Sequence, residues 1–290
     1  MTTSILRWTM KKAARVGMAL SMGTRGLVSV PNTQATSPAI RVLTYHRFGA
    51  SQRDPFCVSA SAFAKHVAWL ANKQLAVSLP DVEAFVRGEK TIPQGAVLIS
   101  IDDGFRSVAK IALPILRDYG IPAAVYVTTG NVGRDVQSAR AHGEHIDEDY
   151  LNWDEIIHLH ESGIAIGSHA HTHRSMACIS LTEATDEAVR SKEQIEKQLS
   201  NQVTSFAYPF GTLADFNTSV AEILYKAGYR SAFTSQHGVI QSGLNALTLP
   251  RIKIEGGEGP WMFPLIAQGG LDGWGWIDRY LWRFQASGAS

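Results

Sequence analysis

The sequence of 290 residues predicts an α/β fold, a distorted (β/α)7 barrel with parallel strands. From residue 40 onward, short runs of β-branched residues alternate with longer segments of helical period, which is typical of βα units on a parallel sheet. Seven such runs lie between residues 40 and 255, fewer than the eight of a complete barrel of ~250 residues. An incomplete or distorted barrel is therefore expected, and a doubly wound open sheet is the alternative.

The predicted helices and strands alternate with consistent end signals. The longest helix starts at a capping box formed by Ser180 and Glu183. Gly120, Gly163 and Gly228 follow three of the helices, where a left-handed C-cap residue is favoured. Residues 131–149 are expected to be an irregular surface loop or lid. The strands are expected at residues 41–45, 96–101, 123–128, 164–167, 204–207, 230–233 and 249–254, and the helices around residues 63–70, 108–119, 156–157 and 181–199.

The composition is that of a globular protein with an uneven charge distribution. Hydrophobic residues make up 45% of the chain and charged residues 18%, so one sizeable core is expected. The formal net charge is +1, which gives no reason to expect nucleic-acid binding, yet no acidic residue precedes Asp54. We therefore divide the chain into a basic N-terminal arm (1–38), a barrel domain (39–256) and an aromatic C-terminal extension (257–290).

The two ends of the chain suggest peripheral contact with a membrane. No stretch approaches the ~20 apolar residues of a membrane span, and the apolar run at 16–22 is too short and polar for a secretory signal. Both ends nevertheless interleave apolar and basic residues, a pattern that suits a membrane interface. The alternative is a disordered arm and a tail that belongs to the core. The residues concerned are Ile5, Leu6, Arg7, Trp8, Met10, Lys11, Lys12, Arg15, Val16 and Met18 at one end, and Trp261, Phe263, Trp274, Trp276, Ile277, Arg279, Tyr280, Leu281, Trp282, Arg283 and Phe284 at the other.

Polar side chains follow nearly every predicted strand. Parallel α/β folds place their active sites at the carboxyl ends of their strands, so these groups are expected to meet at one rim. They include Tyr45 and His46 after the first strand, Asp102 and Asp103 after the second, Thr128 and Thr129 after the third, 168–173 after the fourth, and Tyr208 with Pro209 after the fifth.

Two short motifs among these residues indicate a metal site. Asp102 and Asp103 leave an apolar strand side by side and must point in different directions, so one can bind a cation while the other stays free. The alternative is that one of them caps the next helix. His169 and His173 have the four-residue spacing that brings two imidazoles together on one helical turn. Two imidazoles and one carboxylate are the ligand set of an open catalytic zinc or similar divalent site. His171 is expected to point away from that pair.

These motifs resemble those of the polysaccharide deacetylases, also called the chitooligosaccharide deacetylase homology domain. Residues 100–104 look like the T-F-D-D-G motif of that family, residues 167–173 like its H-S/T-x-x-x-H motif, and residues 206–211 like its third motif. The resemblance spans about residues 40 to 255. It implies a distorted seven-stranded (β/α) barrel, Asp102 as general base, and Asp103, His169 and His173 as metal ligands. It also suggests the backbone N–H of Tyr208 as a donor to the oxyanion.

The match departs from the family at two points. Many members carry an arginine that holds the catalytic aspartate, where this chain has Ala207; Arg251, near the end of the last predicted strand, could supply that cation. No late histidine motif provides the general acid. His46, in a Y-H motif like that of a subgroup with N-terminal extensions, is the candidate, and a structural role for it is the alternative. His237 is a weaker candidate.

The residues and the resemblance together predict a hydrolase that removes acetyl groups from N-acetylated saccharides. A divalent cation, Zn²⁺ with Co²⁺, Ni²⁺ or Fe²⁺ as alternatives, would polarise the amide carbonyl while a carboxylate accepts a proton from the attacking water. The substrate is expected to be a polysaccharide or a lipid-linked saccharide. Two other functions stay open, namely hydrolysis of a non-sugar amide and carbohydrate binding without catalysis.

Overall fold

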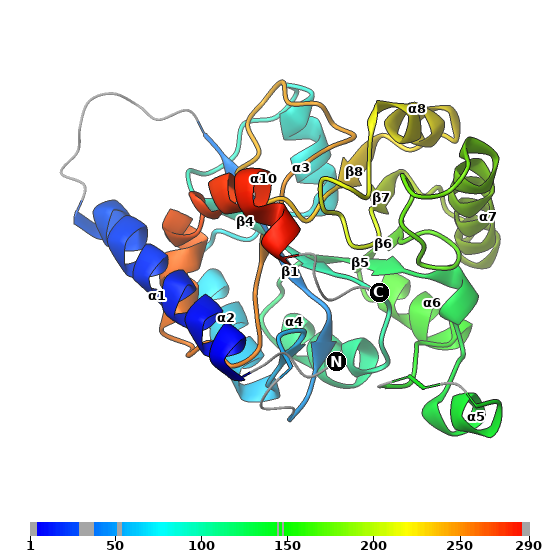
Figure 1. Ribbon diagram of the computed structural model, residues 1–290, viewed down its shortest axis with the longest axis horizontal. Coiled ribbons are helices and arrows are strands. Elements are labelled where there is room, and N and C mark those ends of the chain that lie inside the picture. The colour runs from blue at the N-terminus through cyan, green and yellow to red at the C-terminus, as the bar shows by residue number, and fades with distance from the viewer. Residues whose placement is uncertain (1–4, 29–37, 51–53, 144, 147, 286–290) are drawn as a thin grey trace.

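The computed structural model describes residues 5–28, 38–50, 54–143, 145–146 and 148–285 (Figure 1). The main strands are β1 (Ile40–Tyr45), β4 (Ala96–Ile101), β5 (Ala123–Val127), β6 (Ala165–Ser168), β7 (Ser205–Ala207), β8 (Ser231–Phe233) and β9 (Ile252–Lys253). They form one sheet in the order β8-β7-β6-β5-β4-β1-β9, in which every neighbouring pair is parallel. The predicted distorted (β/α)7 barrel is thus confirmed. A short second sheet pairs β2 (Arg47–Phe48) with β3 (Cys57–Val58).

The distortion of the barrel lies between β8 and β9, the two edge strands of the sheet. Single contacts join the chain there: Phe233 forms an isolated parallel bridge with Leu249, and the Thr234 N–H donates to the Leu249 carbonyl over 2.8 Å. The side chain of Arg251 adds a link, because its Nε donates to the Thr234 carbonyl over 2.8 Å. The barrel is therefore closed between β8 and β9 by contacts of the loop before β9 and by the side chain of Arg251, and not by a ladder between two strands.

Helices with well-defined caps connect the strands. They are α2 (Ala60–Lys73), α3 (Leu79–Val86), a π-helical turn η1 (Val108–Ala112) that runs into α4 (Leu113–Asp118), α6 (Trp153–Glu161), α7 (Leu181–Leu199) and α8 (Thr218–Lys226). The predicted capping box at the start of α7 is present, with Ser180 and Glu183 as partners. Gly120, Gly163 and Gly228 have positive φ angles of 63°, 86° and 98°, as expected for C-caps.

The segment predicted as an irregular loop is partly helical. Residues 131–149 include α5 (Val136–Ala141), whose first turn is capped by the side chain of Asp135, and they follow a 3-10 turn, η2 (Thr129–Asn131). This helix was not predicted because its six residues are too few to show a helical period in the sequence. Glu148 accepts a hydrogen bond from the Ser107 N–H over 2.7 Å, which ties the segment to the start of η1.

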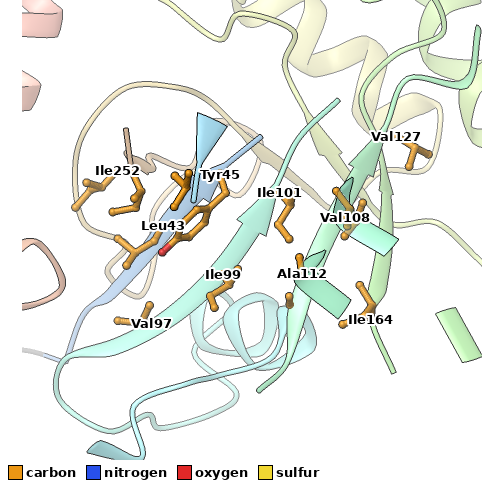
Figure 2. Close-up of a cluster of buried hydrophobic side chains, with 14 of the residues drawn as sticks. Leu43, Tyr45, Val97, Ile99, Ile101, Val108, Ala112, Val127, Ile164 and Ile252 are labelled. Atoms are coloured by element: carbon orange, nitrogen blue, oxygen red, sulfur yellow. The ribbon is translucent and has the colours of Figure 1, made fainter. Parts of the chain in front are cut away.

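Apolar side chains cover both faces of the sheet. Alternate residues of each strand point to opposite faces, so Val42 and Leu98 fill the inside of the barrel while Leu43 and Ile99 face the outer helices. Figure 2 shows part of the outer layer, with Leu43 and Ile99 on neighbouring strands and Val108 of η1 in the same cluster. Because side chains fill the interior, the barrel is a packed core, and the predicted site residues lie at its rim.

Both terminal segments pack onto the barrel. The predicted basic arm contains a helix, α1 (Ile5–Val28), which lies against α9 (Met262–Leu265) and the π-helical turn η3 (Ile266–Gly270) of the C-terminal extension. The last helix is α10 (Trp274–Gln285), and the start of this helix lies against Met22 of α1. In the part of the chain that the structure describes, no helix is long and apolar enough to cross a membrane.

Candidate active site

The ends of three neighbouring strands bring the predicted site residues together. In the parallel ladder between β1 and β4, Tyr45 is opposite Ile101, so the next residues, His46 and Asp102, emerge beside each other. The Asp102 N–H donates to the Tyr45 carbonyl over 3.0 Å and extends this ladder by one step. On the other side of β1, the short strand β9 directly follows Arg251.

Asp102 and Arg251 form a buried, two-pronged ion pair. Two guanidinium nitrogens of Arg251 lie 2.7 Å from the two carboxylate oxygens of Asp102, and one of them also donates to Ser100 Oγ over 2.9 Å. Asp102 is only 2% exposed. Burial by itself would raise the pKa of Asp102, but the charge and the hydrogen bonds of Arg251 oppose it and hold that pKa below its usual value. Asp102 is therefore an ionised carboxylate that is buried beside Arg251.

Asp103 points away from Asp102 because the chain turns sharply between them. Asp103 adopts a left-handed conformation with φ of 71°, and Gly104 continues the turn with φ of 77°. One oxygen of Asp103 lies 3.4 Å from His169 Nε2 and 3.3 Å from His173 Nε2. The two adjacent carboxylates thus face different partners, as predicted from the sequence.

The Asp103, His169 and His173 cluster fits a divalent cation. Its three ligand atoms all lie within 4.8 Å of one another. For a tetrahedral Zn²⁺ with bonds of about 2.0–2.1 Å, neighbouring ligand atoms are about 3.3–3.4 Å apart, which agrees with the two measured distances. His169 Nδ1 lies 2.7 Å from the Ala207 carbonyl and donates to it, which leaves the Nε2 lone pair directed at the cluster.

The chain between the two histidines is a loop held in place by Glu187, a buried residue of α7. Glu187 accepts hydrogen bonds from the N–H groups of His171 and Thr172, over 2.8 and 2.7 Å. The helical turn predicted from the four-residue spacing is wrong, because Ala170 and His173 have positive φ angles of 62° and 60°. The imidazoles still meet, with ring centroids 4.9 Å apart.

His46 lies within electrostatic reach of both aspartates. Burial lowers the pKa of His46, although the charges of Asp103 and Asp102 act in the opposite direction. Its ring packs edge-on against Phe56, with centroids 4.8 Å apart. His46 thus lies beside the two aspartates and against Phe56.

Tyr208 does not offer the free N–H that the resemblance suggested. Its N–H donates to the Phe233 carbonyl over 3.0 Å, and its hydroxyl donates to the Leu247 carbonyl over 2.9 Å. Pro209 has no N–H, so the next donor is the Phe210 N–H, for which the structure shows no partner among the described residues. Phe210 has φ of 60°, and its ring centroid lies 4.9 Å from that of His173.

Two other histidines lie outside the cluster. His171 Nδ1 pairs with Thr129 Oγ1 at 2.8 Å and points away from the ligands, as expected. His237 Nδ1 lies 2.8 Å from a carboxylate oxygen of Asp278, so it anchors α10 and is not part of the rim site. Sequence reasoning missed Ser100 and Glu187, because both act through partners that are distant in the chain. It singled out Phe210 for its aromatic ring and not for its N–H.

The fold and the site define a class of protein. A parallel α/β barrel whose rim places an Asp-His-His cation site beside a buried, ionised aspartate is a metal-dependent hydrolase. The family model of the polysaccharide deacetylases matches residues 89–232 of the chain. The resemblance seen in the sequence is thereby confirmed.

Comparison with known proteins agrees with this assignment. The polysaccharide deacetylase-like protein YxkH of Bacillus subtilis is 24% identical over 217 residues, which cover 74% of this chain and 71% of that protein. The poly-beta-1,6-N-acetyl-D-glucosamine N-deacetylase of Staphylococcus aureus is 23% identical over 208 residues, 69% of this chain and 68% of the enzyme. The structure of IcaB from Ammonifex degensii shares the fold, with a TM-score of 0.67 and 24% identity over 81% of this chain and 98% of IcaB.

Proposed function

We propose that the protein hydrolyses the N-acetyl groups of amino sugars in a polysaccharide or a lipid-linked saccharide. The observation that carries this proposal is the adjacency of the Asp103, His169 and His173 cluster to the Asp102–Arg251 pair. A group that could hold a cation next to an ionised carboxylate supports amide hydrolysis by water. The named activity of the Staphylococcus aureus relative supports the choice of an N-acetylglucosamine polymer as substrate class.

Each residue of the rim has one task in this reaction. A divalent ion held by Asp103, His169 and His173, with Zn²⁺ preferred, supplies polarisation of the acetyl carbonyl and acidification of water. Asp102 accepts the proton of the water that adds to the carbonyl carbon, and Arg251 keeps Asp102 ionised until then.

The remaining groups act on the tetrahedral intermediate and the leaving amine. The Phe210 N–H, in place of that of Tyr208, donates to the developing oxyanion. His46 passes a proton to the sugar nitrogen as the C–N bond breaks, which yields acetate and a free amine.

Metal removal tests the proposal directly. Acetate release should be measured from N-acetylhexosamine oligomers, lipid-linked N-acetyl sugars and simple non-sugar amides, with and without a chelator. We expect release from the saccharides alone, its loss on chelation, and its recovery with Zn²⁺ or Co²⁺. Full activity in a sample verified to be free of metal would contradict the proposal, and activity only on non-sugar amides would change the substrate class.

Replacement of His46 tests the role given to it. His46→Ala should lower kcat by about 10²–10⁴-fold and leave KM nearly unchanged, because protonation of the amine is felt only in the transition state. Steady-state kinetics together with thermal melting distinguish this from a structural role. A variant with wild-type kcat and a lower Tm would assign His46 to the packing against Phe56 alone.

A further inference from the structure

The N-terminal helix α1 packs with two charged side chains, those of Lys12 and Arg15, inward. Arg15 is fully buried and Lys12 nearly so, and both face the segment that follows β9. Lys12 Nζ lies 3.0 Å from a carboxylate oxygen of Glu255, and Arg15 Nε lies 2.5 Å from one of Glu258. Arg15 also donates to the Lys253 carbonyl over 2.7 Å. The basic residues that suggested a solvent-exposed arm are therefore used to hold α1 against the barrel rim.

Among the residues of α1 whose side chains the structure describes, 9–23, the opposite side is exposed to solvent, and the exposed cation is Lys11, which pairs with Glu255. Ala19 and Gly23 continue the buried stripe of Lys12 and Arg15 at helical spacing, so the residues between them face outward. These outward residues are Met10, Ala13, Ala14, Gly17, Leu20 and Ser21. A surface helix of a globular protein normally shows the reverse arrangement, with its apolar side inward.

The last helix also exposes aromatic side chains, and the chain just before it lies beside α1. Gly273, at the start of α10, is so close to Met22 of α1 that a Cβ there would lie 2.8 Å from the Met22 sulfur. From α10, Trp276 and Tyr280 are exposed, and their rings lie 5.3 Å apart. Arg279 is exposed between them. We call the exposed side chains of the two helices the terminal face; it consists of Met10, Leu20, Met22, Trp276, Arg279 and Tyr280.

The terminal face has no available carboxylate. Helix α1 contains no acidic residue. Every acidic residue of positions 255–280 is paired: Glu255 and Glu258 with Lys12 and Arg15, Asp272 with Arg41, and Asp278 with His237. The surface thus offers apolar and aromatic side chains with a cation and no exposed acid.

We propose that the terminal face binds the surface of an anionic phospholipid membrane. Exposed Met, Leu, Trp and Tyr side chains insert at the headgroup boundary, and cations beside them are attracted to anionic lipid. A second copy of the chain is a poorer occupant, because a two-fold contact would set Arg279 against the same cationic face with no carboxylate to pair with it. Since Arg15 binds the Lys253 carbonyl, two residues beyond Arg251, membrane docking brings the active-site rim close to the lipid surface.

Point substitutions test this better than removal of the arm. Deletion of α1 would leave Glu255 and Glu258 without the cations that pair with them and would disturb the rim. The chain offers a matched pair of double variants. Leu20→Glu with Tyr280→Ala changes side chains that are 44% and 61% exposed on the terminal face, whereas Leu181→Glu with Tyr225→Ala changes side chains that are 57% and 62% exposed on α7 and α8.

The measurement is co-sedimentation of the full chain with vesicles of phosphatidylcholine alone or mixed with phosphatidylglycerol, at low and high salt. We expect binding to the anionic vesicles that weakens with salt, a loss of affinity of at least about tenfold in the terminal-face variant, and unchanged binding in the α7 and α8 variant. Failure to sediment with anionic vesicles, equal binding to both lipids, or equal losses in both variants would overturn the proposal. A dimer in light scattering that only the terminal-face variant abolishes would assign the face to a second copy. Acetate release from soluble oligomers, measured in parallel, is expected to be the same in all three proteins.

Discussion

Asp102→Asn should abolish most of the turnover while the protein keeps its metal. Asn has the shape of Asp but cannot accept a proton from water at neutral pH, so kcat is expected to fall by about 10²–10⁴-fold, the usual contribution of a general base. Metal content should stay at the wild-type level, because Asp102 is not among the three residues whose ligand atoms cluster. The measurement is acetate release at saturating substrate together with elemental analysis of the purified protein.

Asp103→Asn is the matched control for this experiment, since it makes the same chemical change one residue away. It should lose metal and turnover together, because Asp103 provides the carboxylate that both histidines face. If Asp102→Asn loses the metal and Asp103→Asn retains it, the roles of the two aspartates are reversed.

Arg251→Ala should have the largest effect on both stability and the pH dependence of turnover. It leaves the carboxylate of Asp102 buried without a cation, and such a change typically costs about 3–5 kcal/mol in the free energy of unfolding. In the wild type the depressed pKa of Asp102 stabilises the fold above the unfolded-state value of about 3.9, and this contribution is lost as the pH falls through the lower folded-state pKa. Without Arg251, burial raises the pKa of Asp102, so the stability deficit should be largest near neutral pH and shrink in acid.

The pH–rate profile of Arg251→Ala measures the effect of this substitution on catalysis. Because Asp102 must be ionised to act as a base, the acid limb of kcat/KM should move to higher pH in Arg251→Ala. Arg251→Lys is the control: it keeps a positive charge but cannot make both contacts to Asp102, so it should give a smaller displacement. If Arg251→Ala changes neither the acid limb nor the free energy of unfolding, Arg251 does not keep Asp102 ionised.

Much of the fold could be predicted from local patterns. The strands are apolar runs with polar residues at their carboxyl ends, and this alone predicted that Asp102, Asp103 and His169 meet at one rim. The pairing of Asp102 with Arg251 was also predicted. The chain has Ala207 where many family members carry an arginine, so another cation was needed beside Asp102. The position of the site at one rim follows from parallel strands, and the alternation of strands and helices in the sequence predicts such strands.

Other features depend on contacts that no local pattern encodes. The loop from His169 to His173 was predicted as a helical turn, because spacing alone does not reveal left-handed residues such as Ala170. The Tyr208 N–H is used by a neighbouring strand, which depends on the exact register of β7 and β8. Lys12 was predicted to lie in a basic arm that contacts a membrane, yet it pairs with Glu255, which is 243 residues away in the chain.

The seam between β8 and β9 is expected to delay the pairing of Asp102 with Arg251 until most of the sheet has formed. Asp102 and Arg251 are 149 residues apart in the chain, and Arg251 reaches Asp102 from the segment that also bonds to Thr234 across the gap. Contacts of such long sequence separation form late, because the entropy of closing the intervening loop must first be overcome. A folding intermediate can therefore contain the six strands from β1 to β8 with native ladders and still lack an oriented base. In refolding, recovery of enzyme activity then reports ring closure, while circular dichroism reports the earlier growth of the sheet.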